Sequence, residues 1–280
     1  MKLVRTIAEL AATPRRGSVG FVPTMGAFHD GHLALFRAAR DQNDSVVASL
    51  FVNPAQFGPN EDLAAYPRDE ERDARLAEEV GVDVLFVPSS DELYPPGFQT
   101  WVEVEQLGGV LEGAHRPGHF RGVATICLKL FNLVRPDRAY FGQKDAQQVA
   151  VIKRMVADLN VPVEIRAVAT VRDPDGLALS SRNAYLSAEE RELARQLPRA
   201  LATKDADAAR AALDGLEVEY LEVADFEPRV LAAAVRVGST RLIDNVVLDG
   251  GAARDAQPIN AAVAGENRGG FRSRPEEETP

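Results

Sequence analysis

Residues 21–35 read Phe-Val-Pro-Thr-Met-Gly-Ala-Phe-His-Asp-Gly-His-Leu-Ala-Leu, and this stretch is the starting point for interpreting the whole chain. Its opening continues an apolar run from Val19 that is typical of a short buried strand. A proline and two glycines interrupt the run, and helical spacing resumes at residues 33–40. We therefore expect His29 and His32 at the point where a strand passes into a helix.

The two histidines suggest a site for phosphate groups. Backbone N–H groups in the first turn of a helix lack partners within the helix, and the helix dipole favours anions there. Two imidazoles three residues apart add further donors. A single histidine near a helix is about as often a packed or capping residue, but two in a His-x-Gly-His turn directly after a strand favour phosphate binding.

Length and composition indicate one large or two modest globular domains. The chain has 280 residues, of which 45% are hydrophobic and 26% charged. A net charge of −10 argues against a nucleic-acid partner, which requires a basic face, but a local cluster of donors can still bind ATP. We find no signal-peptide pattern and no apolar run of membrane-spanning length, so we predict a cytoplasmic protein without a membrane partner. The single cysteine, Cys127, is flanked by apolar residues and is expected to pack in the core.

Apolar and β-branched runs alternate with helical patterns along the first part of the chain. The strand-like runs cover residues 45–52, 82–87, 139–141 and 163–171, with an edge strand expected at 100–104. The helical patterns cover residues 70–80, 123–134 and 149–159. This alternation predicts an α/β fold with a Rossmann-like, doubly wound parallel sheet.

The pattern changes after about residue 172. Helical patterns at 188–202 and 206–213 precede strand-like runs at 217–223, 231–237 and 241–248. We interpret residues 1–172 as the Rossmann-like domain and residues 173–249 as a smaller C-terminal α+β cap domain. Residues 250–280 lack hydrophobic periodicity and are expected to be a disordered tail.

Four polar clusters follow predicted strands or turns, at residues 25–32, 53–56, 142–148 and 180–183. Each alone is commonly a turn, a surface ion pair or a cap. His-x-Gly-His is similar to the signature of a nucleotidyltransferase superfamily. Together the clusters resemble the pantothenate synthetase family through Pro-Thr-Met-Gly-Ala-Phe-His-Asp-Gly-His, Val-Asn-Pro-x-Gln-Phe, Phe-Gly-x-Lys-Asp-x-Gln-Gln and Ser-Ser-Arg-Asn. This likeness extends to about residue 249.

The resemblance implies an ATP-dependent ligase. In that reaction the carboxylate of pantoate attacks the α-phosphorus of ATP, which releases pyrophosphate and leaves pantoyl adenylate. The amine of β-alanine then displaces AMP and gives pantothenate. The resemblance also implies Mg²⁺ and a homodimer.

The resemblance assigns residues to this chemistry, with His29 as the proton donor. The implied catalytic residues are His29, His32, Lys144, Ser180, Ser181 and Arg182. The implied ATP site contains these together with Met25, Gly26, Ala27, Phe28, Asp30, Gly31, Gly142, Gln143, Asp145, Val171 and Leu179. Gln56 and Gln148 are implied to bind pantoate, Gln56 also near β-alanine, and Asp145 is a candidate to hold Mg²⁺ or to orient Lys144.

Two alternative functions stay open. Another nucleotidyltransferase of the superfamily would need more basic groups near the glutamines, and a catalytically silent nucleotide-binding homologue usually loses a phosphate-side histidine or lysine.

Three positions depart from the family pattern. Gln143, Ala146 and Leu179 stand where the family usually has Glu, an aromatic residue and Met. None of these departures removes a group that the resemblance assigns to chemistry.

Overall fold

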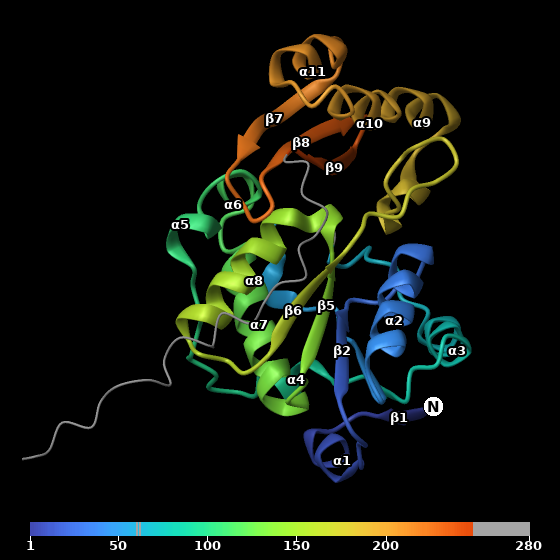
Figure 1. Ribbon diagram of the computed structural model, residues 1–280, viewed down its shortest axis with the longest axis vertical. Helices are drawn as coiled ribbons and strands as arrows, with labels where there is room; N and C mark the ends of the chain where they lie inside the picture. Colours follow the sequence, from blue (N-terminus) through green and yellow to red (C-terminus); the bar gives the residue numbers. More distant parts are fainter. Residues whose placement is uncertain (60, 62, 249–280) are drawn as a thin grey trace, which may run out of the picture. The chain divides into compact units, whose positions relative to one another are not determined.

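The computed structural model describes residues 1–59, 61 and 63–248, in which a parallel sheet has six strands (Figure 1). These strands are β1 (Lys2–Val4), β2 (Val19–Thr24), β3 (Ser45–Leu50), β4 (Val84–Phe86), β5 (Arg138–Gly142) and β6 (Glu164–Val168). Their order is β1-β4-β3-β2-β5-β6. The chain therefore builds outward from β2 to β4 and then returns to the other side of β2 at β5. This reversal confirms the predicted doubly wound sheet and places a crevice at the carboxyl ends of β2 and β5.

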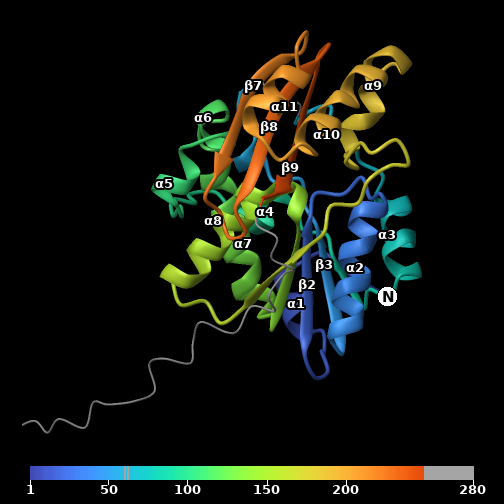
Figure 2. The ribbon, with the colours of Figure 1, turned by 45° about the horizontal axis from the view of Figure 1, so that its top comes forward.

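Helices cover both faces of the sheet (Figures 1 and 2). One face carries α2 (Asp30–Gln42) and α3 (Glu70–Glu79), and the other carries α1 (Ile7–Ala12), α7 (His119–Val134) and α8 (Ala146–Asp158). Successive side chains of β2 alternate between these layers. Phe21 packs against Phe131 of α7 with ring centroids 6.3 Å apart, whereas Val22 joins the cluster that contains Phe36 of α2. The sheet therefore has a separate apolar core on each face.

The segment at 100–104 is not a strand, so that prediction was wrong. The backbone N–H of Val102 donates to Thr125 Oγ1 of α7 over 2.9 Å, which holds the segment along a helix. The shorter helices of the first 145 residues are the 3₁₀-helices η1 (Pro54–Gln56) and η2 (Gln143–Asp145), with α4 (Ser90–Leu93), α5 (Glu105–Gly108) and α6 (Glu112–His115). Cys127 is buried, as predicted, and burial raises the pKa of its thiol to about 12.

The C-terminal part has the predicted α+β character. Its antiparallel sheet contains β7 (Glu217–Ala224), β8 (Val230–Val237) and β9 (Thr240–Val247) in that order. The 3₁₀-helix η3 (Ser181–Tyr185) precedes α9 (Ala188–Ala194), α10 (Gln196–Leu201) and α11 (Ala206–Ala212). The single helix predicted at 188–202 is thus two helices, because Pro198 has no N–H to continue the ladder across the junction.

The central strand β8 is buried on both faces. Leu231, Ala233 and Val235 pack with the helices α9–α11, while Ala232 and Ala234 face a cluster that contains Leu111 and Ala146. Small alanines suit a strand that is covered on both sides. Ala146, where the resemblance leads us to expect an aromatic residue, packs in the same cluster as Tyr220 and Phe226.

A buried ion-pair network joins β9 to α6. Arg241 Nη1 and Nη2 donate to the two oxygens of Glu112 over 2.8 and 2.6 Å, and the Tyr220 hydroxyl donates to Glu112 over 2.8 Å. Arg241 Nε also donates to Glu219 over 2.6 Å. Burial alone would raise the pKa of Glu112, but the hydrogen bonds and charge of Arg241 outweigh it and hold that pKa below its usual range.

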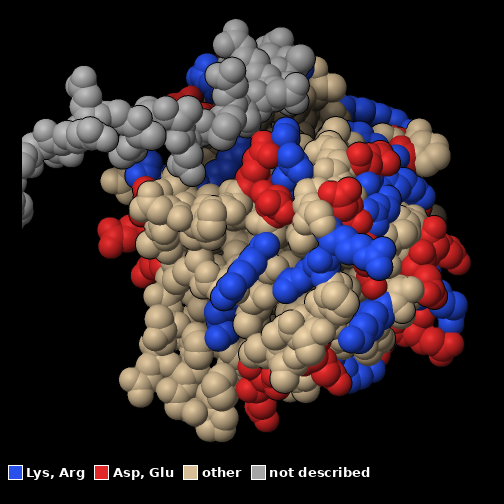
Figure 3. Space-filling model, turned by 60° about the horizontal axis from the view of Figure 1, so that its bottom comes forward, with Lys and Arg blue, Asp and Glu red and all other residues tan. Residues whose placement is uncertain are grey.

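The described residues of 1–250 form one compact unit, and the boundary predicted at residue 172 stays a prediction. The tail expected at 250–280 lies outside the described residues. Among the described residues, no helix has the length and apolar character that crossing a membrane requires. Lys and Arg side chains lie among acidic and uncharged residues on the face shown in Figure 3.

We predict that Glu112→Ala lowers the free energy of unfolding by about 3 kcal/mol, because it leaves the Arg241 guanidinium buried with one carboxylate fewer. Urea denaturation measures the change. Glu71→Ala is the matched control: its partner Arg75 is 60% exposed, so we expect a change of at most about 0.5 kcal/mol. Equal losses in the two variants would contradict the structural role of Glu112.

Candidate active site

A cavity of about 730 Å³ opens at the carboxyl ends of β2, β3 and β5, and segments far apart in the sequence line it. A cavity of this size suits a small-molecule ligand. Each of the four polar clusters contributes to its lining. The lining includes Met25, His29, Gly31, His32, Gln56, Gly142, Lys144, Asp145, Gln148, Val171, Leu179, Ser180, Ser181 and Arg182.

Backbone hydrogen bonds fix the chemical state of the two histidines. The Gly31 N–H donates to Nδ1 of His29 over 3.2 Å, and the His29 N–H donates to Nδ1 of His32 over 3.3 Å. Because both Nδ1 atoms accept, each neutral ring carries its proton on Nε2. A Cβ at position 31 would lie 2.8 Å from Cε1 of His29, so glycine is required beneath this ring.

Burial keeps both imidazoles neutral. Desolvation lowers the pKa of His32 to about 3, with the charges of His29 and Lys144 as lesser causes. Desolvation, followed by the charge of Lys144, also lowers the pKa of His29. The ring centroids of the two histidines are 4.2 Å apart. At neutral pH the pair therefore presents two N–H donors rather than two cations.

The turn before His29 is held by α3. Asp73, whose residue exposure is 0%, accepts the N–H groups of Ala27 and Phe28 over 2.7 and 2.8 Å. Arg72 donates to the carbonyl of Phe28 over 3.0 Å. Ala27 adopts φ of 54°, a conformation that costs free energy unless neighbouring groups hold it. Asp73 therefore positions His29 from outside the motif.

A second turn presents Lys144 to the cavity. Its ammonium lies 3.4 Å from Asp145 Oδ1, and the side chain is 20% exposed. Asn245 of β9 donates to the carbonyls of Gln143 and Lys144 over 2.9 and 2.8 Å. The small sheet thus fixes the turn that follows β5.

The third turn carries Gln56. Its Nε2 donates to Met25 Sδ over 2.9 Å, and its Oε1 accepts from Asn53 Nδ2 over 3.1 Å. Gly122 of α7 lies directly against this turn, because a Cβ there would come within 2.2 Å of the Ala55 carbonyl. Glycine in α7 therefore permits the close approach that positions Gln56 beside Met25.

The segment before η3 brings hydroxyls to the same cavity. Ser180 Oγ accepts from the Arg182 N–H over 3.3 Å and caps η3. Leu179 is close to the start of α2, since a Cβ on Gly31 would lie 3.8 Å from its Cβ. Among the described residues, Asn183 Oδ1 and Ser49 Oγ are buried without a hydrogen-bond partner, and both residues line the cavity.

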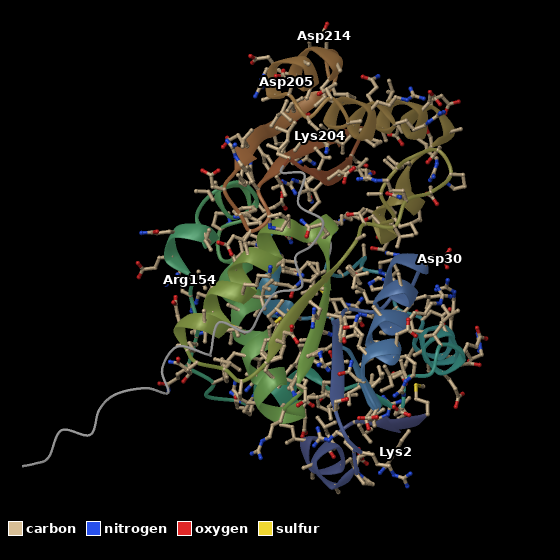
Figure 4. The ribbon with its side chains drawn as sticks, in the orientation of Figure 1. Lys2, Asp30, Arg154, Lys204, Asp205 and Asp214 are labelled. Atoms are coloured by element: carbon tan, nitrogen blue, oxygen red, sulfur yellow. The ribbon has the colours of Figure 1, made fainter. Side chains whose placement is uncertain are left out.

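Other residues of the predicted ATP site lie outside this lining. They are Gly26, Ala27, Phe28, Asp30 and Gln143. The Phe28 ring packs against Phe36 in the core, with centroids 5.1 Å apart. Asp30 is exposed at the start of α2, and its side chain points outward (Figure 4).

Sequence reasoning missed several residues that build the cavity. Asp73 lies four residues before buried Ala77 on α3, so a carboxylate on the inward face of that helix was the available signal. Asn245, Arg116 and His119 lie outside the four polar clusters from which the site was predicted. Arg116 and His119 both line the cavity.

Comparisons with known proteins agree with this geometry. The family model described as pantoate-beta-alanine ligase matches residues 2–247. Pantothenate synthetase from Moorella thermoacetica is 53% identical in an alignment that covers 89% of this chain and 99% of that protein.

Solved structures give the same result. Pantothenate synthetase from Thermus thermophilus has a TM-score of 0.85 and 50% identity, covering 89% of this chain and 99% of its own. Pantoate-beta-alanine ligase from Francisella tularensis, complexed with beta-gamma ATP and beta-alanine, has a TM-score of 0.79 and 35% identity, covering 90% of this chain and 99% of its own. The chain belongs to the pantoate–β-alanine ligase family.

Proposed function

We propose that this protein condenses pantoate with β-alanine at the expense of ATP, through a pantoyl-adenylate intermediate. One observation carries the proposal: four polar turns, separated by up to about 150 residues, line a single cavity at the switch point of the sheet. Family membership and the Francisella complex with beta-gamma ATP and beta-alanine support the same chemistry.

In the first step a carboxylate oxygen of pantoate forms a bond to the α-phosphorus of ATP, and the bond from that phosphorus to the bridging oxygen breaks. Negative charge accumulates on the departing pyrophosphate. The Nε2–H groups of His29 and His32 stabilise that charge as neutral donors, and Lys144 does so as a cation. Ser180, Ser181 and Arg182 contribute further donors to the β- and γ-phosphates.

In the second step the neutral amine of β-alanine attacks the acyl carbon. The carbon–oxygen bond to AMP breaks, AMP leaves, and the new amide nitrogen loses a proton to solvent. Gln56 and Gln148 orient the acyl group, because an amide both donates and accepts without adding negative charge beside a carboxylate.

Mg²⁺ fits this site as an ion carried by the phosphates. Among the described residues, no group of three or more acidic, His or Cys side chains could hold a metal ion. Mg²⁺ commonly uses one or two carboxylates together with substrate phosphates and water. Asp145, with its side chain 42% exposed beside Lys144, would be that carboxylate, and the ion would neutralise phosphate charge.

We also propose that residues 173–249 act as a cap whose approach to ATP excludes water from the reactive adenylate. The protein acts in the cytoplasm, where ATP is supplied. A homodimer is supported by Trp101, which is 40% exposed and stacks on Tyr94 with centroids 6.0 Å apart. Trp101 belongs to the segment at 100–104, which has no strand partner among the described residues.

A catalytically silent homologue is the alternative in a different functional class. It would bind ATP without pantoate-dependent turnover. The retention of His29, His32 and Lys144 around one cavity favours the enzyme.

We predict that His29→Ala slows adenylate formation about 10²- to 10³-fold, because one donor to the developing phosphate charge is lost. Pantoate-dependent exchange of pyrophosphate into ATP measures this step without β-alanine. Circular dichroism and the thermal midpoint serve as folding controls. Exchange within threefold of wild type would contradict the role of His29.

Buried neutral histidines make stability depend on pH. An unfolded histidine titrates near pH 6.5, whereas burial lowers the pKa of His32 to about 3. Between these values the unfolded chain binds more protons, so stability present at pH 7 is lost on acidification. Wild type therefore loses free energy of unfolding between pH 7 and pH 5. We predict that this loss is about 2 kcal/mol smaller in His32→Gln, as measured by urea denaturation at both pH values. An unchanged difference would show that His32 is not buried in its neutral form.

We predict that Trp101→Glu shifts the protein from dimer to monomer, because a carboxylate in the interface loses its hydration. Sedimentation velocity measures the change. Leu159→Glu is the matched control, since Leu159 is 51% exposed at the C-terminal cap of α8 and should leave the dimer intact. A wild-type monomer, or a dimer in both variants, would contradict this interface.

A further inference from the structure

A largely buried arginine lines the cavity next to Gln56, and none of the chemistry above uses it. Arg116 follows α6, and its side chain is 17% exposed. Its Nη2 lies 3.4 Å from the carbonyl oxygen of Gln56. A cation adjacent to the residue expected near β-alanine requires an explanation.

His119 fixes the direction of this guanidinium. Its Nδ1 donates to the Gln56 carbonyl over 2.8 Å, which leaves Nε2 to accept from Arg116 Nη1 over 3.2 Å. Burial, followed by the charge of Arg116, lowers the pKa of His119 to about 4, so the ring is neutral. Arg116 is thus held from one side by an uncharged acceptor.

The other edge of the guanidinium faces Glu61. Arg116 Nε donates to Oε1 of Glu61 over 3.0 Å, and Nη2 donates to Oε2. This is the two-point geometry with which arginine binds a carboxylate. Glu61 belongs to the connection between η1 and α3, and its side chain is 24% exposed, so part of it already contacts solvent.

A second acid near Arg116, Glu112, does not form the same two-point pair with it. Glu112 lies 4.0 Å from Arg116 Nη1, but both of its oxygens already accept from Arg241, and Tyr220 donates to it as well. Glu61 is therefore the replaceable partner. A carboxylate that displaces it would find two aligned N–H donors and a positive charge.

We propose that Arg116 binds the carboxylate of the amine substrate, and that Glu61 occupies the same two donors until that substrate arrives. The inference rests on the proposed function, because β-alanine is the amine that attacks the adenylate. Its carboxylate is separated from the amine by two methylene groups. A carboxylate bound at Arg116 would therefore keep the amine close to Gln56, which is expected to orient the acyl group. An amine without this carboxylate would leave Glu61 in place and gain no orientation.

The test compares two amines, β-alanine and 3-aminopropanamide, which differ in the carboxylate alone. Formation of AMP at saturating ATP and pantoate gives kcat/KM for each. We expect wild type to prefer β-alanine about 100-fold, as for hydrogen bonds to a charged group. Arg116→Gln should reduce that preference to about threefold or less. A preference that persists in Arg116→Gln would overturn the proposal.

Glu61→Gln should strengthen the binding of β-alanine, whereas the Arg116 variant weakens it. A neutral amide competes less well for Arg116, so the KM for β-alanine should fall severalfold while the KM for 3-aminopropanamide stays constant. An unchanged or raised KM for β-alanine would contradict displacement of Glu61. If Arg116→Gln does not fold, Arg116→Lys keeps the charge without the two-point geometry and should retain an intermediate preference; full wild-type preference would overturn the two-point role.

Failure of the proposed function would look different. Pantoate-dependent exchange of pyrophosphate into ATP needs no amine, so its absence in wild type would reject the ligase itself, and this inference with it. Its presence together with equal use of both amines by wild type would reject the carboxylate site alone.

Discussion

Two hydrogen bonds from the main chain at the start of α2 determine what this site can do. By donating to Nδ1 of both His29 and His32, the backbone leaves Nε2–H as the outward donor of each ring. Burial then prevents either ring from becoming a cation near neutral pH. Positive charge is supplied by Lys144, whose own charge disfavours protonation of the histidines. The site therefore combines neutral imidazole donors with the nearby ammonium of Lys144, a division that suits the binding of a polyphosphate.

The order of the strands brings these groups together, and neighbouring elements hold each turn in place. β2 and β5 are adjacent although more than 100 residues separate them, so the turns after them face one another across the switch point. Asp73 of α3 holds the turn before His29, and Asn245 of β9 holds the turn of Lys144. Gly122 lets α7 support Gln56. Each of these cavity-lining turns thus depends on an element outside its own motif, which limits the freedom of the side chains that it carries.

The fold and the four polar turns that line the cavity could be predicted from the sequence, because both leave local signals. Alternating strands and helices leave periodic patterns, and the polar turns keep recognisable motifs. The supports were harder to predict. Helical spacing can place Asp73 on the inward face of α3, but only the tertiary structure shows that it accepts two N–H groups. The wrong strand at 100–104 has a similar origin: its composition suits a strand, but Thr125 of α7 takes its hydrogen bond. Contacts between segments that are distant in the sequence cannot be inferred from the composition of one segment alone.

Nitrogen-15 NMR of the histidine side chains measures the protonation state of the two imidazoles directly. Two-bond correlations distinguish the Nε2–H tautomer, the Nδ1–H tautomer and the imidazolium, and His→Gln variants assign the signals. We predict that His29 and His32 are both neutral at pH 7 with the proton on Nε2, and that His32 stays so at pH 5. A proton on Nδ1 of either ring, or an imidazolium at pH 7, would contradict the account.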